Sequence, residues 1–128
     1  MRIVPAASAL VEKGNYRHFM EKEIHDQPDA CQHTLSAYID PISLTVSSPG
    51  VDFKTVDRLQ IVACGTASYA GMIARYVFES LAGLPTEVEI ASEFRYREPA
   101  LRAGALCLAI SQSGETADTL AALRWCKA

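Results

Sequence analysis

The second half of the chain repeats an order of apolar run, turn of glycine and hydroxyl residues, and helical pattern, and this repeat restricts the possible fold most. Residues 59–64 form a near-continuous apolar run that ends at Gly65. Residues 68–81 then place apolar side chains at helical spacing. A strand that is apolar on both faces is typical of a parallel sheet covered by helices. We therefore expect a parallel strand over 59–64 and a helix over 68–81.

The same order continues toward the end of the sequence. Residues 87–91 alternate polar and apolar, as in a strand at or near the edge of a sheet. Residues 105–110 are the most apolar run in the chain and are predicted to form a central strand, followed by a helix from Ala117 to Trp125. The polar segment SEFRYREP, residues 92–99, lies between the two runs. Its pattern favours a solvated loop or an interface.

These elements predict an α/β fold with three layers: a doubly wound parallel sheet with helices on both faces and right-handed crossovers. In a sheet of order 2-1-3, the connections leaving the first and third strands run to opposite faces, and a crevice opens between the carboxyl ends of those strands. Two unusual turns follow these two strands, CGTAS at residues 64–68 and SQSGET at residues 111–116. We expect both turns to line one pocket.

The first part of the chain has a different character. Residues 1–16 show no sustained period and are interpreted as an arm or linker. Helical patterns run from Tyr16 to Ile24 and from about Pro28 to Tyr38, and two helices are expected because proline would break a continuing helix. Residues 40–52 are rich in Pro, Ser and Gly and form a connection. The sequence thus predicts a helical lead-in before the α/β unit.

Composition excludes several classes of function. The formal net charge of −3 does not favour binding to nucleic acid or to an anionic membrane surface. No apolar run approaches the roughly 20 residues that span a bilayer. The three histidines have no spacing that favours zinc. The four cysteines contain no CxxC pair, which favours free thiols in a reducing cytoplasm. We expect a cytoplasmic protein with no nucleic-acid or membrane partner.

The SQSGET turn has the chemistry of an anion site. A helix N-terminus presents unpaired amides and a partial positive charge. Ser111, Ser113 and Thr116 add hydroxyl donors, and Gly114 lets the main chain approach closely. No lysine or arginine is near in sequence, so the turn suits one monophosphate held by neutral hydrogen bonds. The nucleotide motifs GxxxxGK[ST] and GxGxxG and the serine-hydrolase motif GxSxG are absent.

Simpler interpretations of the same residues stay open. Ser113 or Thr116 could merely cap the following helix, as serine and threonine often do. Cys64 could be a core thiol at a strand end, because no cationic partner is visible in the sequence to lower its pKa. Glu115 and Asp118 fall in the first turn of the helix, where carboxylates interact favourably with the helix dipole. These two carboxylates are expected to be structural.

Three segments also resemble a known family. CGTASYAGMIARYVFESLAGLP, VEIASEFRYRE and SQSGETADTLAALR resemble the start of the isomerase region of glutamine:fructose-6-phosphate aminotransferases, also called glucosamine-6-phosphate synthases. The upstream EKGNYRHFMEKEIHDQP is similar to the linker that joins the glutaminase domain of that family to its first sugar isomerase (SIS) domain. The resemblance runs from about Val11 to Arg124 and implies a SIS fold with flavodoxin-like strand order.

The resemblance implies a set of substrate-binding residues. In the family, the SQSGET loop holds the phosphate of fructose 6-phosphate, and the CGT turn adds further contacts to the sugar phosphate. The implied residues are Ser111, Gln112, Ser113, Thr116, Thr66, Gly65 and Cys64. Ala67 stands where the family often has serine, so only a backbone contact is expected there.

The implied reaction transfers ammonia from glutamine to fructose 6-phosphate and yields glucosamine 6-phosphate, with no metal or organic cofactor. The catalytic residues of the family lie in later parts of its chain, so no catalytic residue is expected here. The chain is expected to be a fragment, with linker and lead-in over 1–52 and the N-terminal half of a SIS domain over 53–128. The expected partners are the sugar phosphate, the missing glutaminase domain, the rest of the isomerase region and a second subunit.

Two other functions remain as alternatives. A stand-alone SIS-type regulatory module would bind sugar phosphate without converting it, but it would be expected to carry a basic DNA-binding helix-turn-helix. Residues 16–38 instead carry mixed charge and match the synthase linker. A structural assembly module that uses residues 92–99 as its interface is the third interpretation.

Overall fold

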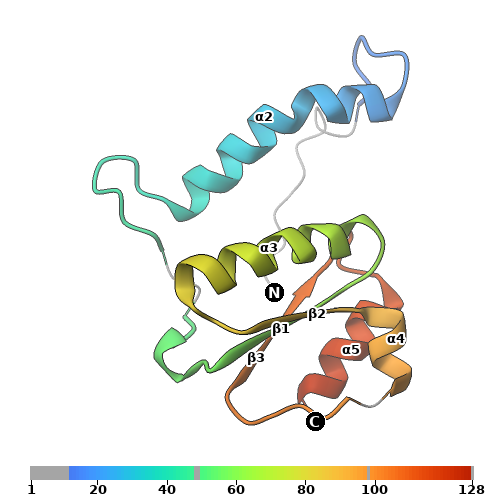
Figure 1. Ribbon diagram of the computed structural model, residues 1–128. Helices are drawn as coiled ribbons and strands as arrows, with labels where there is room; N and C mark the ends of the chain where they lie inside the picture. Colours follow the sequence, from blue (N-terminus) through green and yellow to red (C-terminus); the bar gives the residue numbers. More distant parts are fainter. Residues whose placement is uncertain (1–11, 48–49, 98, 128) are drawn as a thin grey trace. The chain divides into compact units, whose positions relative to one another are not determined.

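The computed structural model describes residues 12–47, 50–97 and 99–127. The chain forms two compact units, residues 1–51 and residues 52–128. The first unit contains helix α2 (Phe19–Tyr38). The second unit contains, in chain order, the 3-10 helix η1 (Phe53–Thr55), β1 (Arg58–Ala63), α3 (Thr66–Ala82), β2 (Thr86–Ile90), α4 (Ala91–Arg97), β3 (Ala105–Ile110) and α5 (Ala117–Lys127) (Figure 1).

Helix α2 is one continuous helix of 20 residues that passes through Pro28. The predicted break at Pro28 is therefore wrong. A proline in the helix interior removes one hydrogen bond, here to the carbonyl of Ile24. Two separate helices would leave up to four amides and four carbonyls unpaired at the new ends, so continuing the helix costs less. Among the described helices, none is both long and apolar enough to cross a membrane.

A hydrogen-bonded turn follows α2. The Ile39 amide donates the last helical bond to the Leu35 carbonyl at 2.8 Å, and the helix ends there because the backbone of Ile39 is extended. The Asp40 carboxylate then accepts from the amides of Ser43 and Ile42, at 3.0 and 2.8 Å. These bonds, first the one from Ser43, hold the pKa of Asp40 below its usual range, because they stabilise the ionised form. The connection after the helix therefore has a defined local structure at its start.

The second unit is built on a parallel sheet with the strand order β2-β1-β3. Strand β1 pairs with both neighbours, so that Leu59 lies beside Thr86 on one side and Leu106 on the other. This order and the helices on both faces confirm the predicted doubly wound α/β fold. The prediction that residues 105–110 form a central strand is wrong for the described sheet, where β1 is central. An apolar run indicates that both faces of a strand are covered, and it does not determine the number of its neighbours.

The helices lie on opposite faces of the sheet, with α3 on one face and α4 and α5 on the other (Figure 1). Helix α3 packs closely against the strands at Gly71. A Cβ atom added there would lie 2.9 Å from Ile61 Cγ2 and 3.2 Å from Val88 Cγ1. Glycine at this position therefore lets the helix backbone approach β1 and β2 directly.

The core on the other face lies under α4 and α5. Val62, Ala91, Phe94 and Ala122 are fully buried there. The rings of Phe94 and Trp125 meet edge to face, with centroids 5.6 Å apart. Residues 91–97 thus form a helix with a buried aromatic anchor, and the predicted solvated loop is wrong. The sequence of this segment is mostly polar because only two of the seven residues of α4 are fully buried.

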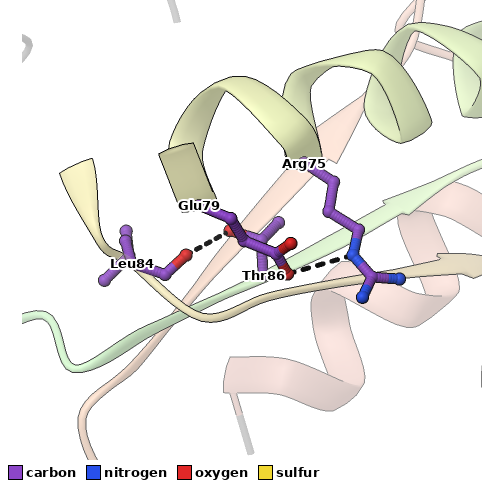
Figure 2. Close-up of polar contacts among 4 residues, drawn as sticks. All are labelled: Arg75, Glu79, Leu84 and Thr86. Carbon is purple, nitrogen blue, oxygen red and sulfur yellow. Dashed lines mark hydrogen bonds and ion pairs between the residues drawn. The ribbon is translucent and has the colours of Figure 1, made fainter. Parts of the chain in front are cut away.

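The connection from α3 to β2 is closed by local bonds (Figure 2). Gly83 adopts a left-handed conformation, with φ of 61°, and its amide donates to the Phe78 carbonyl at the end of the helix. The hydroxyl of Thr86, which is buried at the start of β2, donates to the Leu84 carbonyl at 2.9 Å. On the exposed side of α3, Arg75 Nε lies 3.0 Å from Glu79 Oε1. The turn therefore fixes where β2 begins beside β1.

Candidate functional site

The two unusual turns leave neighbouring strand ends. Ala63, the last residue of β1, pairs with Ile110, the last residue of β3. Cys64 and Ser111 follow directly, and the two turns continue over residues 64–68 and 111–116. Because the strands are parallel, both turns emerge at the carboxyl edge of the sheet. The structure therefore brings the two predicted turns to adjacent positions.

The first turn leads into the N-terminus of α3. Gly65 has φ of 58° and ψ of −138°, a conformation that disfavours side chains. Its carbonyl accepts hydrogen bonds from the amide and the hydroxyl of Ser68, at 3.1 and 2.6 Å. The N-terminus of α3 has no side-chain capping bond. Gly65 and Thr66 are exposed and Cys64 is half-buried, so the turn presents amides and one hydroxyl at the surface.

The second turn is held by its own hydroxyl groups. Ser111 Oγ accepts from the Gly114 amide at 3.0 Å and lies 3.3 Å from Thr116 Oγ1. Ser113 Oγ accepts from the Glu115 amide at 3.1 Å. Gly114 has φ of 70°, which favours glycine. A hydroxyl that accepts a bond keeps its own hydrogen, so the turn can still donate hydrogen bonds to an anion.

The hydrogen bonds of Ser113 and Thr116 show whether their hydroxyls cap helix α5. The Leu120 amide donates to the Thr116 carbonyl at 3.0 Å, which places Thr116 at the start of α5. In the described part of the chain, the Thr116 hydroxyl has Ser111 as its partner and no amide of the first turn of α5. The hydroxyl of Ser113 likewise bonds within the turn. These contacts give the two hydroxyls a role in shaping the turn rather than in capping the helix. Gln112 is exposed beside them.

An ion pair borders the second turn. Arg95 Nη1 of α4 lies 3.0 Å from Asp118 Oδ1 in the first turn of α5. The two residues are 23 positions apart, so sequence spacing offered no signal for this contact. Neither turn contains a lysine or an arginine. Within the described ranges, no three His, Cys, Asp or Glu side chains gather where they could hold a metal ion.

Comparison with known proteins identifies the unit that carries these turns. The family model described as SIS domain matches residues 52–128. The chain belongs to the SIS domain family. The match covers every strand of the sheet and both turns. The predicted SIS fold is therefore confirmed.

Longer relatives extend the match to the whole chain. Proteins of Caulobacter vibrioides and Zymomonas mobilis, both named glutamine--fructose-6-phosphate aminotransferase [isomerizing], are 65% and 56% identical over 100% and 96% of this chain. The chain spans about a fifth of their length, 21% in both cases. A solved structure, the C-terminal domain of glucosamine-fructose-6-phosphate aminotransferase from Francisella tularensis, matches with a TM-score of 0.83 and 45% identity over 91% of this chain and 33% of that one. The predicted resemblance to this enzyme family is confirmed.

The cysteines of this SIS-domain protein should differ sharply in reactivity. Burial, and then the neighbouring Cys126, raises the pKa of the Cys107 thiol to about 12, whereas Cys31 is exposed. The thiolate is the reactive form, so Cys107 should stay unmodified near pH 8 while Cys31 reacts first. Mass spectrometry of peptides after timed iodoacetamide treatment measures this order. Modification of Cys107 as fast as Cys31 in the folded chain would contradict the burial of its thiol.

Proposed function

We propose that residues 52–128 bind the phosphate of fructose 6-phosphate, as part of an enzyme that makes glucosamine 6-phosphate from fructose 6-phosphate and glutamine. The observation that carries the proposal is the adjacency of two donor-rich turns at the ends of β1 and β3. The names of relatives that are 56–65% identical support the choice of substrate. Because the chain spans about a fifth of those relatives, the complete reaction belongs to the proposal as well.

The proposed phosphate site uses neutral donors from both turns. The N-termini of α3 and α5 direct amides and positive dipole ends toward an anion. Ser113 adds a hydroxyl hydrogen, the bonded pair of Ser111 and Thr116 adds one more, and the exposed side chain of Gln112 adds an amide donor. The first turn contributes Cys64, Gly65 and Thr66, which follow β1 directly. Each hydrogen bond to the charged phosphate contributes about 1.5–3 kcal/mol.

The proposed reaction also requires other parts of the enzyme. No residue of this chain is assigned to catalysis, and ammonia would come from a glutaminase domain. Ring opening and isomerisation would need the remainder of the isomerase region, and no metal or organic cofactor is assigned to them. We propose a homodimer in the cytoplasm, where the four free thiols would remain reduced.

Alanine in place of Ser113 or Thr116 tests the phosphate site. Each substitution removes one hydroxyl donor, so the free energy of binding fructose 6-phosphate should become less favourable by about 1–3 kcal/mol. Calorimetric titration measures this change. Ser80→Ala is the matched control, because the Ser80 hydroxyl bonds to the Val77 carbonyl on the exposed part of α3. This control should bind as the unsubstituted chain does. Unchanged affinity in both test variants would return Ser113 and Thr116 to a purely structural role.

A further inference from the structure

Helix α4 lies beside the proposed phosphate site, but none of its residues belongs to the proposed set of phosphate donors. Its Arg95 reaches across to the first turn of α5, where Nη1 contacts Asp118 Oδ1 at 3.0 Å. The guanidinium also lies over the ring of Tyr96, 5.2 Å from the centroid. The pair joins α4 to the helix that begins directly after the SQSGET turn.

Stability alone does not account for this pair. The side chains of Arg95 and Asp118 are 42% and 35% exposed, and an ion pair at such a position contributes little to folding. Helix α4 is instead anchored by Ala91 and Phe94, which are fully buried. The buried side chains therefore hold α4 in position without Arg95. The main effect of the ion pair is on the charge at the N-terminus of α5.

The charge of Asp118 is placed where it opposes an anionic ligand. Asp118 lies two residues after Thr116, in the first turn of α5. A carboxylate there interacts favourably with the helix dipole, but it reduces the positive potential that an incoming phosphate meets. Glu115, in the SQSGET turn just before α5, is a second acidic group near this helix end, and neither the CGTAS turn nor the SQSGET turn contains a lysine or an arginine. Arg95 of α4 brings a cation to this helix end.

We propose that Arg95 is a positioning residue for phosphate binding that acts through Asp118. The guanidinium neutralises the Asp118 carboxylate and holds it in the ion pair, so that Asp118 no longer opposes the dianion that the amides and hydroxyls of the turn would bind. Arg95 itself makes no contact with the substrate. This inference rests on the proposed binding of a sugar phosphate at residues 111–116.

Arg95→Gln and a matched control on the same helix test the inference. Arg97→Gln removes the same charge, but Arg97 pairs with Glu89 of β2 rather than with α5. With fructose 6-phosphate as the titrant, Arg95→Gln should weaken binding about threefold to tenfold, because it leaves Asp118 unpaired. Arg97→Gln should bind as the unsubstituted chain does. Urea unfolding of each variant verifies that the fold is retained.

Two further measurements separate a charge effect from a displacement of α4. The double variant Arg95→Gln with Asp118→Asn should recover the affinity, since it removes the free carboxylate. The defect of Arg95→Gln should also shrink as salt rises from about 0.01 M to about 1 M, where the screening length falls from about 30 Å to about 3 Å. Arg95→Lys, which keeps the charge, should retain most of the affinity.

The outcomes distinguish this inference from the proposed function. If the unsubstituted chain fails to bind fructose 6-phosphate, the proposed function fails and the inference fails with it. If the unsubstituted chain binds and Arg95→Gln binds equally well, the inference alone is overturned. A defect that persists in the double variant and at high salt would also overturn it, because it would show a loss of structure rather than of charge balance.

Discussion

Replacing Phe94 with alanine should lower the free energy of unfolding of the 52–128 unit by about 3–5 kcal/mol. Phe94 is fully buried between the sheet and α5, and its ring meets Trp125 edge to face. The substitution removes the anchor of α4 and leaves a cavity beside Val62 and Ala122. Small domains are stable by only about 5–15 kcal/mol, so this loss should be visible as a large shift of the urea midpoint.

Tyr96→Ala is the control for the Phe94 substitution. Tyr96 lies in the same helix and is also aromatic, but its side chain is 75% exposed. Its replacement should change the free energy of unfolding by no more than about 0.5 kcal/mol. Equal destabilisation by the two substitutions would show that α4 has no buried side, against the packing described.

Gly71→Leu should destabilise the same unit by about 1–3 kcal/mol or more. The cause here is overpacking, whereas Phe94→Ala leaves a cavity. Even a Cβ atom at this position would lie 2.9 Å from Ile61 Cγ2, and Val88 blocks a shift toward β2. Helix α3 would have to move away from the sheet to accept a larger side chain. Urea unfolding followed by circular dichroism measures the loss.

Ala70→Leu provides the comparison for Gly71→Leu. Ala70 precedes Gly71 in α3 and is exposed, so leucine there meets solvent. The two variants add a leucine to the same helix, one toward the sheet and one away from it. Similar stability of the two variants would contradict the close approach of α3 to β1.

The strands and the two turns could be predicted because their signals are local. Residues 59–64 are a near-continuous apolar run, residues 105–110 are a continuous one, and each is followed by glycine and hydroxyl residues. β1 was predicted to within one residue at each end, and β3 has the predicted bounds. The adjacency of the turns followed from the topology of a doubly wound sheet, in which the first and third strands are neighbours.

The errors arose where long-range contacts determine the structure. Residues 92–98 look polar, and the burial of Phe94 depends on Trp125, which lies far along the chain. The pairing of Arg95 with Asp118 likewise depends on how α4 and α5 pack, and no spacing rule reveals it. Pro28 shows a different limit, since its local preference for a break is outweighed by the hydrogen bonds of the helix on both sides.

The placement of α3 and α5 on opposite faces has a consequence for how the unit responds to its ligand. Among the described residues, the two helices each contact the sheet and have no contacts with one another. A single anion held by both turns would join the two helical layers at the edge of the sheet. Ligand at 100 times its dissociation constant would add about 2.7 kcal/mol to the folded state. If the proposed site binds sugar phosphate, a higher concentration of that ligand would lower the unfolded fraction of the unit and, with it, the rate of proteolysis.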